Sequence, residues 1–99
     1  MAKNPVYMFA DVDVHNLEEY KIYREKVKPI IENYGGKYLI RGGEIDTLET
    51  KLWKPTRIVL VKFPNKKLAM EWYNSDEYRP YKKIRFENAT SNILMVEGT

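Results

Sequence analysis

Residues 57–63 read Arg57-Ile58-Val59-Leu60-Val61-Lys62-Phe63, and this is the clearest β-strand in the chain. Successive side chains of a strand point to opposite faces of its sheet. Hydrocarbon therefore projects from both faces here, with Ile58 and Leu60 on one and Val59, Val61 and Phe63 on the other. A strand with one wet face alternates apolar and polar residues, so this pattern predicts a sheet that is covered on both sides.

The segments on either side of this strand supply the rest of an α+β domain. Alternation from Val6 to Val14 predicts a first strand, and an apolar stripe after the cap Asn16 predicts a helix that ends at Gly35-Gly36. Pro29 lies inside this helix, where we expect it to cause a kink. The other predicted elements are a short strand over 37–41, a second helix after Asn65, a short third helix from Pro80 and a last strand over 92–96.

The order of these elements is strand, helix, strand, strand, helix, strand. It predicts a ferredoxin-like βαββαβ sandwich, in which an antiparallel sheet carries its helices on one face. In the short second strand, we expect Tyr38 and Ile40 on the same side. The chain has 99 residues, which is too few for two cores, so a single domain over residues 1–99 is expected.

Helices on one face leave the other face of the sheet open. The last strand repeats the two-sided pattern, with Ile93 and Met95 opposed to Leu94 and Val96. This open face would expose an apolar area on the order of some hundreds of Å², which is unusual on a monomer. We therefore predict a homodimer through the sheet face, with an unseen hetero-partner as the alternative. RNA-recognition domains share the strand order but place aromatic residues on this face, where the chain is aliphatic, so no nucleic-acid partner is expected.

Composition narrows the possible functions. The net charge is +3 and the isoelectric point is near 9.0, with basic and acidic residues interspersed. This balance allows a mildly positive pocket for an acidic small molecule. The chain has no cysteine, which excludes disulfides, thiolate catalysis and cysteine-based zinc or iron–sulfur sites. The first residues contain no hydrophobic run typical of a signal peptide or membrane span, so no membrane partner and a cytoplasmic location are expected.

A set of motifs extends over most of the chain: the stretch from Tyr34 to Gly43, Leu48-Glu49, Trp53, Pro55, Arg57, Phe63-Pro64, Ala69, the stretch from Trp72 to Tyr78, and Arg85. Together these motifs resemble one bacterial family, the domain of unknown function 1330. The resemblance implies the dimeric α/β barrel superfamily, in which two ferredoxin-like sheets face each other. That superfamily includes cofactor-free oxygenases, isomerases, polyketide cyclases, haem-handling enzymes and ligand-binding domains, and fold does not choose among them. Lys62 stands where the family usually has an acid, so an acidic catalytic group at that position is missing here.

The candidate site combines arginines, aromatic residues and one carboxylate. We expect these groups to converge at one end of the sheet as a small-molecule pocket in each subunit, for an acidic or enolisable ligand. The predicted ligand-binding residues are Arg41, Trp53, Arg57, Trp72, Ser75 and Arg85. In an enzyme, Glu49 or Tyr78 would move a proton while an arginine stabilises an enolate, without a cofactor. The alternatives are a non-catalytic ligand-binding module and a purely structural dimer, in which arginine–glutamate pairs only tie loops together.

No metal site is expected. His15 is the only histidine and lies beside the first helix cap, which indicates a surface or capping role. Asp11, Asp13 and His15 share one strand face, but a solvated strand end explains this spacing better than a divalent metal does.

Overall fold

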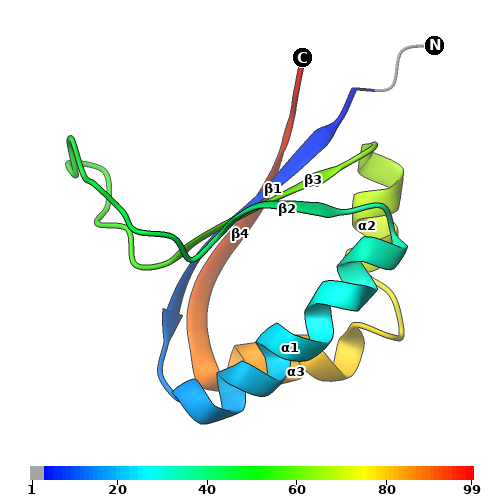
Figure 1. The fold of residues 1–99 in the computed structure, drawn as a ribbon, viewed down its shortest axis with the longest axis horizontal. Helices are drawn as coiled ribbons and strands as arrows, with labels where there is room; N and C mark the ends of the chain where they lie inside the picture. The colour runs from blue at the N-terminus through cyan, green and yellow to red at the C-terminus, as the bar shows by residue number, and fades with distance from the viewer. Residues whose placement is uncertain (1–3) are drawn as a thin grey trace.

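The computed structural model describes residues 4–99, which form one four-stranded antiparallel sheet and three helices (Figure 1). The elements are β1 (Val6–Val14), α1 (Leu17–Asn33), β2 (Lys37–Arg41), β3 (Ile58–Phe63), α2 (Lys66–Tyr73), α3 (Arg79–Asn88) and β4 (Ala89–Glu97). The strand order is β2-β3-β1-β4, and the three helices lie on one side of the sheet. The predicted architecture, an antiparallel α+β sandwich with helices on one face, is confirmed.

Helix α1 begins and ends as its flanking residues predict. The Asn16 side chain accepts a hydrogen bond from the backbone N–H of Glu19 at 3.2 Å, which satisfies one of the free donors of the first turn. Gly35 follows the helix with a positive φ of +83°, a conformation that glycine adopts at little cost. Pro29 lies within α1, which continues as one helix to Asn33.

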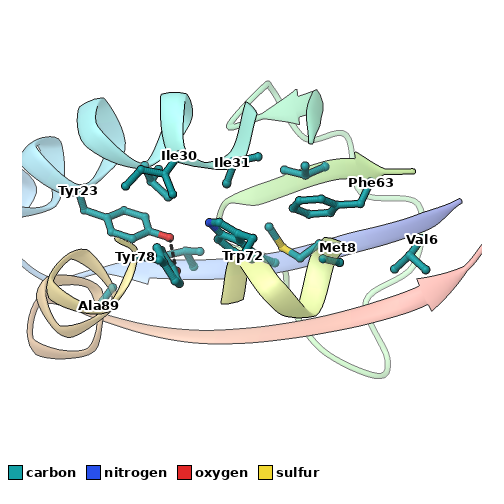
Figure 2. Close-up of a cluster of buried hydrophobic side chains, with 14 of the residues drawn as sticks. Val6, Met8, Tyr23, Ile30, Ile31, Phe63, Trp72, Tyr78 and Ala89 are labelled. Carbon is teal, nitrogen blue, oxygen red and sulfur yellow. Dashed lines mark hydrogen bonds between the residues drawn. The ribbon is translucent and has the colours of Figure 1, made fainter. Parts of the chain in front are cut away.

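The core fills the space between the helices and one face of the sheet. β1 contributes Val6, Met8, Ala10 and Val12, all nearly inaccessible to solvent. The aromatic rings of Phe63, Trp72 and Tyr78 are fully buried, with centroids 5.6 Å apart for Phe63–Trp72 and 4.4 Å apart for Trp72–Tyr78 (Figure 2). Such contacts between large rings contribute more than their buried area alone.

Strand β2 differs from the prediction because it contains a bulge. Tyr38 lies opposite Val61, yet Ile40 lies opposite Leu60, so the register shifts at Leu39. The extra residue moves Ile40 to the face away from the helices, and Tyr38 and Ile40 therefore lie on opposite faces. The prediction that these two side chains share a face is wrong, because it assumed a regular strand.

Strand β4 is longer than its hydropathy predicts. It begins at Ala89, directly after α3, and pairs with β1 as far as Val14. Thr90 and Ser91 are polar and were therefore expected to precede the strand. Backbone pairing to the long β1 partner extends the ladder through them. This early start places Ser91 beside the helices, where it contacts the candidate site described below.

Candidate functional site

A small cavity lies between α1 and the sheet. Its volume is about 30 Å³, space for one or two water molecules. The sheet contributes a hydrocarbon floor that includes Met8, Ala10 and Val12, and Val27 and Ile31 of α1 lie above it. The charged side chains around it are four arginines: Arg24, Arg41, Arg57 and Arg85. Within residues 4–99, no acidic side chain lines this cavity.

Arg85 is the deepest of the four arginines. Helix α3 carries it into the interior, and only 3% of its surface is exposed. Its Nε donates to the Tyr78 hydroxyl at 3.4 Å and its Nη1 donates to Ser91 Oγ of β4. Its Nη2 is buried and has no hydrogen-bond partner among the described residues.

The charge of Arg85 is maintained despite this burial. Burial acts to lower the pKa of the guanidinium, but the negative charges that Tyr78 and Tyr23 carry once they ionise at high pH outweigh burial and raise the pKa above its usual value. At neutral pH both tyrosines are uncharged, so their charges do not offset the burial of the cation. The two ion pairs found within residues 4–99 are Lys21–Glu25 and Arg79–Asp76, so neither compensates Arg85. The structure therefore holds a buried cation that lines a cavity without a counter-ion, an arrangement that is costly unless an anion binds.

Arg41 and Arg57 close the outer side of the cavity. The bulge in β2 puts Arg41 opposite Val59, on the helix side of the sheet, and its guanidinium donates to the backbone carbonyl of Arg24 in α1. The Arg41 guanidinium also lies 4.6 Å from the centre of the Tyr38 ring. Arg57 packs over Gly42, where a Cβ atom would come within 2.6 Å of the guanidinium carbon. Gly42 has a positive φ of +74°, a conformation that favours glycine.

An open groove continues outward from these arginines. Its volume is about 600 Å³, and it is lined by Arg24, Lys28, Arg41 and Arg57 together with Glu25 and Glu32. Four cations face two carboxylates, so the groove is basic. Arg85 does not line it, which separates an inner chamber from an outer groove.

Four tyrosines line or adjoin the chamber. Tyr20 and Tyr23 of α1 and Tyr38 of β2 line it, and the Tyr23 hydroxyl is hydrogen-bonded to that of Tyr78 at 2.8 Å (Figure 2). Burial raises the pKa of Tyr20, although the positive charges of Arg57, Arg85 and Arg41 act to lower it. Burial also raises the pKa of Tyr23 strongly. These hydroxyls therefore keep their protons at neutral pH and can donate hydrogen bonds to an anion.

The structure brings together some of the predicted site residues and separates others. Arg41, Arg57 and Arg85 meet at the cavity, and Tyr78 contacts Arg85 from within the core. Ser75 accepts from the Tyr78 backbone N–H at 3.2 Å and so shapes the turn before α3. Trp72 is fully buried in the core, and Glu49 is exposed in the loop between β2 and β3, away from the cavity lining.

Five site residues are absent from the site predicted from the sequence. They are Tyr20, Tyr23, Arg24, Tyr38 and Ser91. Tyr20 and Tyr23 lie on the apolar stripe that predicts the first helix. Their hydroxyl groups, with Arg24 beside them, were the available signal, because a polar tip on a buried helix face needs a partner.

Asp11 anchors the end of the loop that carries Trp53. Its carboxylate accepts hydrogen bonds from the backbone N–H groups of Thr56 at 2.9 Å and Arg57 at 3.0 Å, and from Trp53 Nε1 at 2.7 Å. Burial acts to raise the pKa of Asp11, but the three donors outweigh burial and lower the pKa. Asp11 thus fixes Arg57 next to the cavity, and it holds Trp53 edge-on to Phe9 at 6.5 Å between ring centroids.

Replacement of Asp11 by asparagine is expected to lower the free energy of unfolding by about 1–2 kcal/mol at pH 7, because an amide satisfies fewer of these donors. A lowered folded-state pKa stabilises the protein above the ordinary value of about 3.9, and this contribution is lost as pH falls through the folded-state pKa. The difference between wild type and Asp11→Asn should therefore shrink below pH 4 in urea unfolding. Asp13→Asn, on the same sheet face but exposed, is the matched control; an equal loss in both variants would contradict the anchoring role.

His15 and Asp13 do not form a metal centre with Asp11. His15 Nε2 is hydrogen-bonded to Thr90 Oγ1 at 3.0 Å, at the exposed end of the sheet. Over the described part of the chain, no group of histidine and acidic residues has the arrangement needed to hold a metal ion. None of the helices in residues 4–99 is long and apolar enough to span a membrane.

Comparison with known proteins identifies a family and a fold. The family model described as "Domain of unknown function (DUF1330)" matches residues 5–99. A protein of unknown function from Rhodopseudomonas palustris superposes with a TM-score of 0.78 at 19% identity, over 99% of this chain and 85% of that chain. SnoaB, a cofactor-independent oxygenase from Streptomyces nogalater, superposes with a TM-score of 0.70 at 9% identity, over 97% of this chain and 94% of that chain.

A third structure bears on assembly. It is a dimeric protein of unknown function and ferredoxin-like fold from Bacteroides fragilis, with a TM-score of 0.56 at 13% identity, over 95% of this chain and 96% of that chain. No curated protein matches the chain. At these identities the likeness establishes the fold alone, and it confirms the predicted ferredoxin-like class.

Proposed function

The chain belongs to the DUF1330 family, and from this premise and the arginines around its cavity we propose that it binds a small organic anion as a homodimer. Each subunit would hold one ligand between α1 and the sheet. The ligand class is an acidic or enolisable small molecule. The observation that carries the proposal is Arg85, a residue that lines the cavity and whose buried Nη2 has no hydrogen-bond partner among residues 4–99.

The electrostatics of the chamber favour an oxyanion. A buried guanidinium that lacks a counter-ion lowers stability, and a carboxylate or enolate oxygen at Nη2 would remove that cost. The protonated hydroxyls of Tyr20 and Tyr23 offer further donors at the same place. A neutral ligand could accept hydrogen bonds here but would not balance the charge of Arg85, and a cation would be repelled.

The size of the chamber limits which part of a ligand it takes. A volume of about 30 Å³ admits a small head group and excludes the rest of a typical metabolite, since ligand pockets usually measure about 300–1,000 Å³. A longer ligand would therefore require the chamber to open toward the outer groove. Arg41 and Arg24 stand between the two spaces and would have to move apart.

The direct test is a thermal-shift titration with hexanoate, benzoate and acetoacetate. Millimolar concentrations of at least one acid should raise the melting temperature, because a ligand that binds only the folded state stabilises it. Arg85→Gln should abolish the shift. Arg79→Gln, an identical change at an exposed position of the same helix, should retain it. No shift in wild type, or equal shifts in both variants, would overturn the proposal.

The homodimer is proposed from the open face of the sheet. One row across all four strands is apolar, because the pairing aligns Ile40 with Leu60, Leu60 with Phe9, and Phe9 with Leu94. In the isolated chain Leu94 is 47% exposed. The loop between β2 and β3 projects from the sheet on this same side, away from the helices (Figure 1). A second copy seated on the row would cover it.

Catalysis at the same cavity is a second candidate function. It is supported by the fold likeness to SnoaB and to two structures described as putative antibiotic biosynthesis monooxygenases, from Caulobacter crescentus and Nitrosomonas europaea. Arg85 with the tyrosine hydroxyls suits the stabilisation of an enolate. Raised pKa values keep the tyrosine hydroxyls protonated at neutral pH, so they cannot accept a proton from a ligand. Glu49 lies elsewhere, and these two facts favour binding over proton removal. Oxygen uptake with an enolisable acid such as acetoacetate distinguishes catalysis from binding.

A further inference from the structure

Arg41 and Arg85 line the same cavity, but they approach it from opposite edges of the sheet. Arg85 is hydrogen-bonded to Ser91 of β4, whereas Arg41 lies on β2. These strands are the two edges of the sheet. Three interstrand spacings of about 4.8 Å separate their backbones by roughly 14 Å. The side chains of Arg41 and Arg85 reach inward from these two edges. The gap that remains between their positive charges is therefore as long as several carbon–carbon bonds.

The wall between these ends is hydrocarbon. Val59 of β3, Met8 and Ala10 of β1 and Ile93 of β4 form it on the sheet side. It offers no charge to a ligand. A molecule that runs from Arg85 toward Arg41 would therefore gain by being apolar in its middle.

The outer end differs from the inner end in access. The groove is open and contains Arg24, Arg41 and Arg57, while Arg85 is confined to the chamber. Glu25 and Glu32 also line the groove, and the exposed Lys21 lies 4.0 Å from Glu25. The cations remain in excess there, so a second oxyanion is favoured at the outer end as well.

We infer that the ligand is an elongated organic acid with an oxyanion at each end and an apolar middle. This inference rests on the proposed function and specifies its ligand class. The inner oxyanion binds Arg85 Nη2, and the outer one binds Arg41 and Arg57. In the free protein the backbone carbonyl of Arg24 accepts from Arg41, and the outer oxyanion of the ligand replaces that carbonyl.

Matched pairs of acids test this inference. Adipate and hexanoate share a six-carbon chain and differ only in the second carboxylate. Isothermal titration should give adipate, or its longer homologues pimelate and suberate, an affinity at least tenfold above that of the monoacid of equal length. Arg41→Gln should remove this advantage, so that the ratio of the adipate affinity to the hexanoate affinity falls to about one, while the control Arg79→Gln should keep the tenfold ratio.

The outcomes separate the two proposals. If mono- and diacids of every length bind equally well in an Arg85-dependent way, the two-ended ligand is wrong and the proposed function stands. If no acid binds, both are wrong. Arg41 is only half-buried at an edge strand, so Arg41→Gln is expected to fold, and circular dichroism checks this. Loss of hexanoate and adipate binding together in folded Arg41→Gln would also overturn the assignment of Arg41 to the outer oxyanion.

Discussion

Replacement of Arg85 by methionine is expected to weaken acid binding by about 100-fold while the folded protein becomes more stable. A hundredfold loss corresponds to about 2.7 kcal/mol, a typical value for a charge-assisted hydrogen bond that is removed from a dry site. Methionine fills a similar volume without a charge. Because Arg85 has no counter-ion among the described residues, its removal relieves a desolvation cost.

The gain in stability should be about 1–3 kcal/mol by urea unfolding of the ligand-free protein. It is smaller than the full cost of a buried charge, because the bonds from Arg85 to Tyr78 and Ser91 are lost with it. Tyr78 keeps its hydrogen bond to Tyr23. A residue that improves binding and lowers stability is typical of a functional site.

A loss of stability would contradict this view of Arg85. If Arg85→Met unfolds several kcal/mol more easily, the guanidinium serves mainly to tie α3 to β4, and the cavity is a packing defect. Ser91→Ala is the matched control, since it removes the tie to β4 and leaves the charge in place. It should cost about 1 kcal/mol and leave acid binding within a few-fold of wild type.

The fold could be predicted because its signals are local. Alternation in 57–63, the cap at Asn16 and the stop at Gly35 each depend on a few neighbouring residues, and the structure contains all three features. Residues that are apolar on both faces of a strand also indicate a covered sheet without any knowledge of tertiary contacts. The sequence therefore predicts the elements and their layers.

The site was less predictable because it depends on register. The extra residue at Leu39 determines which face Arg41 occupies, and no composition or period reveals a bulge in a five-residue strand. The position of Arg57 depends in turn on its hydrogen bond to Asp11, which is 46 residues away in sequence. Glu49 was grouped with these arginines because it is near them in the chain, yet the loop carries it to an exposed position.

Buried tyrosines were ambiguous for a different reason. A tyrosine on the apolar stripe of a helix is compatible with core packing and with a cavity wall, because only its hydroxyl differs from phenylalanine. Tyr23 contacts Tyr78 in the core and also lines the chamber, so it serves both purposes. Only the position of Arg85, a residue of the different helix α3, shows that these tyrosines also form a cavity wall.

A single charge on the open sheet face is expected to dissociate the proposed homodimer. Leu94 ends the apolar row that Ile40, Leu60 and Phe9 continue across the sheet. Leu94→Glu would bury a carboxylate in each half of a two-fold interface without a partner, which costs several kcal/mol. The dimer should weaken by more than about 1,000-fold, equivalent to roughly 4 kcal/mol.

Sedimentation velocity between 1 and 50 µM measures this effect. Wild type should sediment as a dimer and Leu94→Glu as a monomer with unchanged circular dichroism, because residue 94 faces away from the core of its own subunit. Met70→Glu adds the same charge to an exposed apolar residue on the helix side and should remain a dimer. A monomeric wild type would refute the assembly. If Leu94→Glu dimerises with unchanged affinity, the dimer interface does not lie on the open face of the sheet. Since the cavity lies on the opposite side of the sheet, the monomer should still bind acids through Arg85, and this separates assembly from ligand binding.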